Sequence, residues 1–196
     1  MIISASSISI YAPKISMSAA TIVAGNYIPI VQERICLICN NYFDSDTIYL
    51  ETTATFNTTA QSITINQTSW EQYGFKVNDD IIIYKSLRND GIVTLSSITG
   101  NVAVIASTSS IVNESYSTNP STCIYFGLVQ WPKSVIQAAA LMIYFDTDLR
   151  DKYDPQIKSR SLGPLSESYG GIDESNYGYP SKIIDRLLPF MIARFN

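Results

Sequence analysis

The most reactive side chains are three cysteines, two of which, Cys36 and Cys39, have the C-x-x-C spacing of redox and zinc sites. A redox pair sits at the start of a helix that follows a strand, in an electropositive setting, whereas this pair falls late in an apolar helical stretch. Zinc takes four ligands, so a chain with three cysteines and no histidine would need a carboxylate as well. The odd cysteine, Cys123, argues against a disulfide framework. We therefore interpret the pair as core thiols.

Carboxylates are the next candidates for metal or acid–base chemistry. The tightest clusters, Asp44-Ser45-Asp46 and Asn78-Asp79-Asp80, lack the central glycine and terminal glutamate of a calcium loop, so turn and cap roles explain them better. The absence of histidine removes the commonest general base, and no phosphate-binding or nucleophile motif is present. We expect no enzymatic activity, cofactor or metal. A small hydrolase with an Asp or Glu pair stays open, because sequence alone does not place carboxylates opposite one another.

The charge balance limits the partners. The net charge is −4 with no cluster of Lys or Arg, which argues against sequence-specific nucleic-acid binding. Charged residues make up 15% of the chain, where about 25% is usual. Either neighbouring subunits cover part of the surface, or Ser, Thr and Asn cover a β-rich domain. No basic residue precedes Lys14, and the longest apolar run, 138–145, is too short for a membrane span. We expect a soluble, intracellular protein without a membrane partner.

The first part of the chain, to about residue 43, is helical in character. Ser18 can cap a short helix over 19–24, with Gly25-Asn26 as its stop. A second helix is predicted from about Pro29 to Asn40, because its apolar residues recur on one stripe. These residues are Ile28, Val31, Ile35 and Ile38.

The middle of the chain has the composition of short strands. Asp90-Gly91 and Gly100-Asn101 mark hairpins between them, and the pattern predicts a small antiparallel barrel or sandwich. Trp70, Tyr73 and Phe75 are either core residues or a sugar-stacking platform. The predicted strands are 47–55, 62–66, 80–86, 91–98, 102–107 and 122–128.

The last third returns to helix, from Trp131-Pro132 to near Arg150. A polar stretch, 151–179, is too rich in Gly and Pro for a helix and too long for a simple linker. A final helix begins at Pro180 and should kink at Pro189. The predicted fold is α+β: a small bundle of three to four helices with an inserted antiparallel β-barrel or sandwich and a long extended arm. The predicted parts are 1–45 (helical core), 46–127 (β module) and 128–196 (helical core with the arm 151–179).

Three stretches carry a resemblance to a known family, and together they cover about half of the chain. They are Ile28-Pro29-Ile30-Val31-Gln32-Glu33-Arg34-Ile35 with Cys39-Asn40-Asn41-Tyr42-Phe43, then Trp131-Pro132-Lys133 with the helix 138–144, and Ile157-Lys158-Ser159-Arg160-Ser161-Leu162-Gly163-Pro164-Leu165-Ser166-Glu167-Ser168-Tyr169 with Gly178-Tyr179-Pro180. Their order and spacing resemble the head–tail connector (adaptor) proteins of tailed bacteriophages. Arg160 stands where that family has an acidic residue, so the contact of this position does not carry over. Asp79-Asp80-Ile81-Ile82-Ile83 with Asn89-Asp90-Gly91 also resembles the barrel insertion of some members.

The resemblance implies a structural virion protein. It implies a dodecameric ring of this chain at the neck, assembled in the host cytoplasm and placed between the portal protein and the downstream stopper and tail proteins. Viral DNA would pass through the lumen without sequence-specific binding. The residues expected to contact neighbouring copies or the portal are Lys158, Ser159, Leu162, Leu165, Tyr169, Tyr179, Phe190, Met191 and Phe195.

Two other functions stay open at this point. The chain is compatible with another phage neck or tail completion protein, such as a stopper or tail terminator. It is also compatible with a β-rich carbohydrate- or receptor-binding module, for which the aromatic cluster at 70–75 is the feature to examine.

Overall fold

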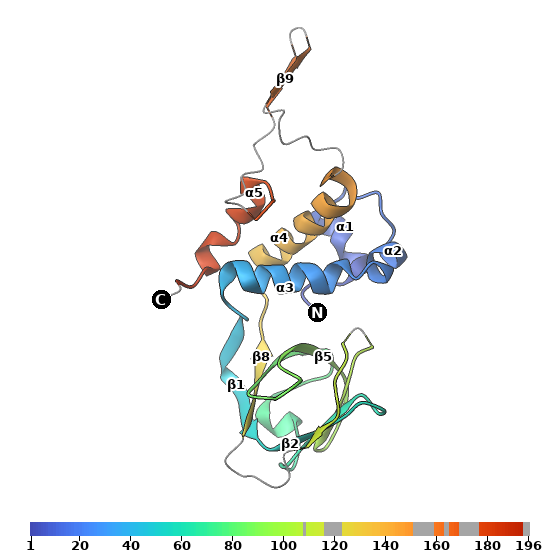
Figure 1. Cartoon of the computed structure of the whole chain (residues 1–196), viewed down its shortest axis with the longest axis vertical. Coiled ribbons are helices and arrows are strands. Elements are labelled where there is room, and N and C mark those ends of the chain that lie inside the picture. The colour runs from blue at the N-terminus through green and yellow to red at the C-terminus, as the bar shows by residue number, and fades with distance from the viewer. Residues whose placement is uncertain (108, 116–122, 151–158, 163–164, 169–176, 194–196) are drawn as a thin grey trace. The chain divides into compact units, whose positions relative to one another are not determined.

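A computed structural model describes residues 1–107, 109–115, 123–150, 159–162, 165–168 and 177–193. The chain divides into two compact units (Figure 1). The sheet unit is Tyr42–Gln130 together with Met1, and the helical unit is Ile2–Asn41 with Trp131–Asn196. In the sequence, the sheet unit is therefore inserted between the two halves of the helical unit.

Within the described residues the helical unit contains five short α-helices, rather than the predicted bundle of three to four. A 3-10 turn, η1 (Ala5–Ser7), precedes the first helix, and a single π-helical turn, η3 (Phe145–Leu149), continues the fourth. The helices are α1 (Ile8–Tyr11), α2 (Ala19–Ala24), α3 (Tyr27–Cys39), α4 (Lys133–Tyr144) and α5 (Ser181–Ile184).

Local sequence signals set two of these helices, as predicted. The Ser18 side chain caps α2 by accepting a hydrogen bond from the Thr21 amide at 3.2 Å. Asn40 ends α3 in the left-handed conformation, with a φ of 48°. The apolar stripe of α3 is buried and α3 packs against α4, where three consecutive alanines, residues 138–140, are fully buried. Small side chains let the two helix backbones approach closely.

The last helix is shorter than predicted. It ends at Ile184, and only a 3-10 turn, η6 (Leu188–Phe190), follows. Pro189 has no amide hydrogen to donate and its ring clashes with the preceding turn, so the apolar pattern that continues to Met191 does not continue as a helix.

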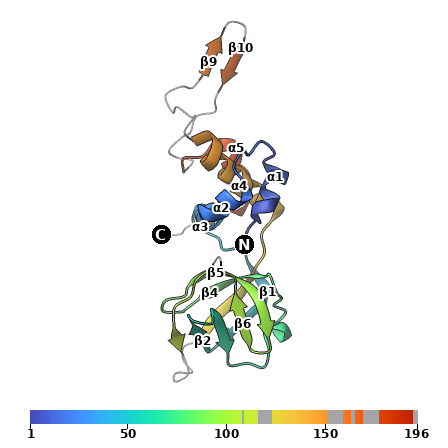
Figure 2. The same ribbon diagram turned by 90° about the vertical axis from the view of Figure 1, so that its right-hand side faces the viewer.

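The predicted barrel or sandwich is wrong, because the described residues of the sheet unit form one open, antiparallel, eight-stranded sheet. Several of its strands are labelled in Figure 2. The strand order is β1-β8-β4-β5-β6-β3-β2-β7, and no ladder joins the edge strands β1 and β7 among the described residues. Edge strand β7 has only two residues, and the register of β1 shifts between Asp44 and Tyr49. The strands are β1 (Asp44–Thr52), β2 (Ala54–Asn57), β3 (Ser62–Ile65), β4 (Asp80–Tyr84), β5 (Gly91–Thr99), β6 (Val102–Ile105), β7 (Glu114–Ser115) and β8 (Ile124–Val129).

One of the two predicted hairpin turns has a different geometry. Strands β5 and β6 pair through Thr99 and Val102 around Gly100, whose φ is 56°, as predicted. Strands β4 and β5 also pair, but the positive φ angles lie at Lys85 and Gly91 rather than at Asp90. The Asp90 carboxylate instead accepts a hydrogen bond from the Ser86 amide at 2.7 Å, which closes a wider loop.

The aromatic cluster at 70–75 belongs to the core of the sheet unit. Trp70 and Phe75 are fully buried, with ring centroids 5.4 Å apart. The Trp70 indole donates a hydrogen bond to the Asn101 carbonyl at 3.1 Å. Tyr73 is partly buried against the same core. These rings therefore stabilise the sheet and do not form an exposed sugar-binding platform.

The described part of the arm is not simply extended, which corrects that prediction too. It is a two-stranded antiparallel hairpin of β9 (Ser159–Leu162) and β10 (Leu165–Ser168). The other residues between 151 and 176 lie outside the described ranges.

Candidate functional site

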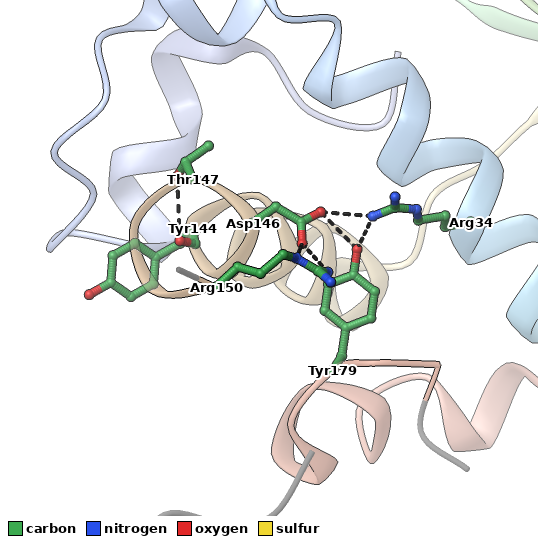
Figure 3. Close-up of polar contacts among 6 residues, drawn as sticks. All are labelled: Arg34, Tyr144, Asp146, Thr147, Arg150 and Tyr179. Carbon is green, nitrogen blue, oxygen red and sulfur yellow. Dashed lines mark hydrogen bonds and ion pairs between the residues drawn. The ribbon is translucent and has the colours of Figure 1, made fainter. Parts of the chain in front are cut away.

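Asp146 is the centre of a polar cluster in the helical unit (Figure 3). Its side chain is only 9% exposed. One carboxylate oxygen, Oδ2, accepts hydrogen bonds from Arg34 Nη1 at 2.9 Å and from the Tyr179 hydroxyl at 2.8 Å. The other, Oδ1, accepts from Arg150 Nε at 3.0 Å. We call Arg34, Asp146, Arg150 and Tyr179 the clamp.

The local fold places the acid of the clamp. Helix α4 continues into the π-helical turn η3, and both of its aspartates face partners from distant parts of the chain. Asp148 accepts a hydrogen bond from the Ser16 amide at 3.1 Å, and Asp146 binds Arg34 of α3. Arg150 lies four residues after Asp146, a spacing that brings opposite charges together on a helix. Single π-turns within α-helices are often found at functional sites.

Tyr179 completes the clamp from the far end of the chain. The residue is 1% exposed, and its ring centroid lies 5.8 Å from that of Phe145. The guanidinium groups of Arg34 and Arg150 lie over the ring, at 5.9 Å and 5.4 Å from its centroid. Each contact combines a cation with the electron-rich face of the ring, so the tyrosine is held by its ring as well as by its hydroxyl.

The protonation states of Tyr179 and Arg34 suit these two side chains to hold the clamp together. Burial, and then the neighbouring Asp146 carboxylate, raise the pKa of Tyr179 to about 12. For Arg34, burial lowers the pKa, but the hydrogen bonds and charges of Tyr179 and Asp146 outweigh it and the pKa is raised. At neutral pH the tyrosine therefore keeps its proton and donates a hydrogen bond to Asp146, and the arginine stays charged. Neither Tyr179 nor Arg34 is poised to exchange a proton near pH 7.

The clamp fixes both ends of the segment that contains the hairpin. Arg150 is the last described residue before this segment, and Tyr179 lies three residues after its last undescribed position, 176. Both side chains meet at Asp146. The chain therefore leaves and re-enters the helical unit at one place, tied to α3 through Arg34.

Within that segment, β9 and β10 pair only with each other among the described residues. In the register of the two strands, Leu162 lies opposite Leu165 and Arg160 lies opposite Glu167. A two-stranded hairpin is marginally stable in water without a third strand or a packing surface. The outer edges of β9 and β10 thus suit addition to a strand of another chain.

The expected contact residues are distributed over three places. Tyr179 is in the clamp, Ser159 and Leu162 are in β9, and Leu165 is in β10. Phe190 and Met191 are half-buried near the end of α3. Lys158, Tyr169 and Phe195 lie outside the described residues.

The C-terminal residues pack partly on their own unit. The Ile192 amide donates to the Cys39 carbonyl at 2.8 Å, and Asn41 Nδ2 donates to the Phe190 carbonyl at 3.3 Å. Leu188 and Ile192 nevertheless remain 54% exposed. The segment is therefore anchored at the end of α3 and still presents apolar side chains.

Sequence reasoning missed three members of the clamp, Arg34, Asp146 and Arg150. The spacing of Asp146 and Arg150 was a signal that could have been used, because opposite charges four residues apart interact on a helix. Arg34 gave no such signal, because its partners lie more than a hundred residues away in the chain.

Cys36, Cys39 and the acidic cluster at 78–80 have structural roles. Cys36 and Cys39 are buried, and burial raises their thiol pKa values to about 12 and about 11. Thiols protonated at neutral pH are poor nucleophiles, so both are core residues, as predicted. The Asp79 carboxylate accepts a hydrogen bond from the Lys76 amide at 2.7 Å, as a turn residue does.

None of the helices in the described ranges combines the length and the apolar character that crossing a membrane requires. Neither a scan against protein-family models nor a search of curated proteins finds a match for the chain. The function of the chain is therefore inferred from its own residues.

Proposed function

We propose that this chain is a structural subunit without enzymatic activity, which forms the head–tail connector ring of a tailed bacteriophage. In this role, copies of the chain bind to one another and to the portal protein above, present a platform to the tail proteins below, and extend the DNA channel. The observation that carries the proposal is the clamp, which fixes both ends of the segment that contains the β9–β10 hairpin.

A subunit that grips its neighbour with an arm needs a firm base for that arm. The clamp supplies one, because a single buried carboxylate holds Arg150 before the segment and Tyr179 after it. The hairpin supplies the gripping element, because its outer backbone edges have no partner strand in the described part of the chain. Contacts between an arm on one copy and a different surface on the next are heterologous, and such contacts close into rings when the rotation permits.

The charge and the C-terminal segment also support this proposal. A net charge of −4 without a basic cluster suits the wall of a channel that DNA passes without being held. Leu188 and Ile192, anchored beside the end of α3, are exposed apolar side chains that suit contact with another protein. We assign this face to the portal protein.

The proposal is tested by sedimentation and negative-stain imaging of the chain, alone and mixed with the portal protein of the same phage. We expect discrete rings, which bind the portal at one face. Rings that bind tail tubes but not the portal would instead indicate a stopper or a tail terminator. A chain that stays monomeric with both partners would contradict a connector role.

A matched variant tests the arm. Residues 157–169 are replaced by a short Gly-Ser linker, which removes the hairpin and keeps Arg150 and Tyr179 in place. We expect this variant to have the circular dichroism of the unmodified chain and to form no rings. Normal rings without the hairpin would show that the arm is not the gripping element.

A further inference from the structure

Tyrosine side chains line one face of the sheet unit. Tyr49 of β1 and Tyr125 of β8 are stacked, with ring centroids 5.9 Å apart and an interplanar angle of 17°. Tyr84 of β4 lies 5.8 Å from Tyr125, and Tyr42 meets the edge of Tyr84 at 5.5 Å. We call these four residues the tyrosine face. Tyr42 and Tyr49 are 39% and 51% exposed, whereas Tyr84 and Tyr125 are half-buried, so solvent reaches the part of the face that Tyr42 and Tyr49 form.

Gly127 makes room for this arrangement. In β8, Gly127 and Tyr125 are two residues apart and share a side of the sheet, opposite the core side of Phe126. A Cβ atom at Gly127 would lie 2.8 Å from Tyr125 Cε1 and 3.2 Å from Ile82 Cγ2. The Tyr125 ring therefore lies over the glycine, and the tyrosine face is a built surface rather than a set of separate side chains.

The tyrosine face is acidic at its margin. Asp44 and Asp46 are exposed, and neither forms an ion pair within the described ranges. Asp44 Oδ2 accepts a hydrogen bond from the Tyr125 hydroxyl at 3.3 Å. Burial and then the charge of Asp44 raise the pKa of Tyr125. Two carboxylates without an ion-pair partner among the described residues thus border a row of aromatic rings.

This combination favours one kind of partner, an extended basic segment. Arginine stacks on tyrosine rings and forms charge-assisted hydrogen bonds with carboxylates. Strand β1, which carries Tyr49, is an edge strand, so a strand can be added beside it. The chain itself is acidic, yet its segment 157–169 contains two cations, Lys158 and Arg160, and one anion, Glu167.

We infer that the tyrosine face binds the β9–β10 hairpin of a second copy of this chain, with Arg160 placed over the rings and paired with Asp44 and Asp46. The inference rests on the proposed function, and it names the surface that the arm grips. It also gives Arg160 a reason to be basic, because the surface that it meets is acidic.

Disulfide trapping between two differently labelled copies tests the inference. Both copies carry Cys123→Ser, which removes the half-buried native thiol. One copy carries Glu51→Cys, directly opposite Tyr125 in the sheet, and the other carries Ser161→Cys in β9. After mild oxidation of the mixture we expect a covalent dimer of the two different copies. The matched control replaces Glu51→Cys by Glu71→Cys, an exposed glutamate in the 3-10 turn η2 (Glu71–Tyr73), and should give no such dimer.

Charge reversal makes the test specific. Arg160→Glu in the hairpin copy should reduce the yield of the dimer by about tenfold or more, and so should Asp44→Lys with Asp46→Lys in the other copy. The two reversals together should restore it, whereas Lys182→Glu on the exposed start of α5 should have no effect. A missing dimer, a yield insensitive to charge, or a bond that forms only inside a chain with both cysteines would overturn the inference. If these reversals leave rings intact in the imaging assay, the inference fails and the proposed function stands.

Discussion

Replacement of Asp146 by Asn tests whether the clamp stabilises the helical unit. Asn has nearly the same shape, but it is uncharged, and it offers one acceptor oxygen where the carboxylate offers two. At least one donor of the clamp, the Tyr179 hydroxyl or an arginine, then loses its acceptor, which costs about 1–3 kcal/mol. The two arginine side chains are 45% exposed, so each ion pair contributes only about 0.2–1 kcal/mol after screening by solvent. We expect the free energy of unfolding to fall by about 2–4 kcal/mol.

The assay is urea denaturation followed by far-ultraviolet circular dichroism, with a double-mutant cycle. Tyr179→Phe keeps the ring and its cation contacts and should cost about 1 kcal/mol. Combined with Asp146→Asn it should add less than it costs alone, because Asp146→Asn has already weakened the same hydrogen bond. Asp185→Asn, on an exposed residue, is the matched control and should stay within about 0.5 kcal/mol of the unmodified chain. The reasoning would be refuted if Asp146→Asn lowered the free energy of unfolding no more than Asp185→Asn does. It would also be refuted if the effects of Asp146→Asn and Tyr179→Phe on that free energy were strictly additive.

Three further predictions concern other parts of the chain. Raising the pH from about 9 to 12 should destabilise the helical unit. In the folded state the pKa values of Cys36, Cys39 and Tyr179 are raised to about 12, 11 and 12, from ordinary values of 9.0, 9.0 and 10.0, so the unfolded state loses these protons first as the pH rises. A urea midpoint that stays constant over this range would contradict this. Glu114→Ala should cost about 1–3 kcal/mol and speed amide exchange in the loop after β4, whose donors bind that carboxylate. Gly127→Ala should displace Tyr125, cost about 1 kcal/mol and weaken the near-ultraviolet circular dichroism of the stacked tyrosines.

Elements that depend on neighbouring residues could be predicted from the sequence. The cap at Ser18, the stop at Asn40 and the buried stripe of α3 each depend on residues within a few positions of one another, and all are confirmed. Most strand positions and the turn at Gly100 are confirmed for the same reason. The predicted geometry of the loop before Gly91 was wrong, because backbone amides of this loop donate hydrogen bonds to the side chain of the distant Glu114.

Closure of the sheet and the members of the clamp could not be predicted in this way. Alternation of apolar and polar residues sets which face of a strand is buried, and it is the same in a barrel and in an open sheet. Whether β1 meets the far edge depends instead on strand register, such as the shift of β1 after Asp44, which the alternation does not set. The clamp joins α3 to η3 and to Tyr179, so only the assembled fold brings Arg34 to Asp146.

The hairpin and the tyrosine face differ in shape and charge, so the contact that we infer is heterologous and each copy must use both surfaces. This has a consequence that a self-complementary contact would not have. A copy with Arg160→Glu has an acidic hairpin and an acidic face, and a copy with Asp44→Lys and Asp46→Lys has a basic hairpin and a basic face. In each variant the two surfaces repel each other, so neither variant should form rings alone.

In a mixture, the acidic hairpin of the first variant fits the basic face of the second, and the basic hairpin of the second fits the acidic face of the first. The mixture should therefore form rings in which the two variants alternate, visible by imaging and native mass spectrometry. Rings from either variant alone, or none from the mixture, would show that this pair of surfaces does not join neighbouring copies.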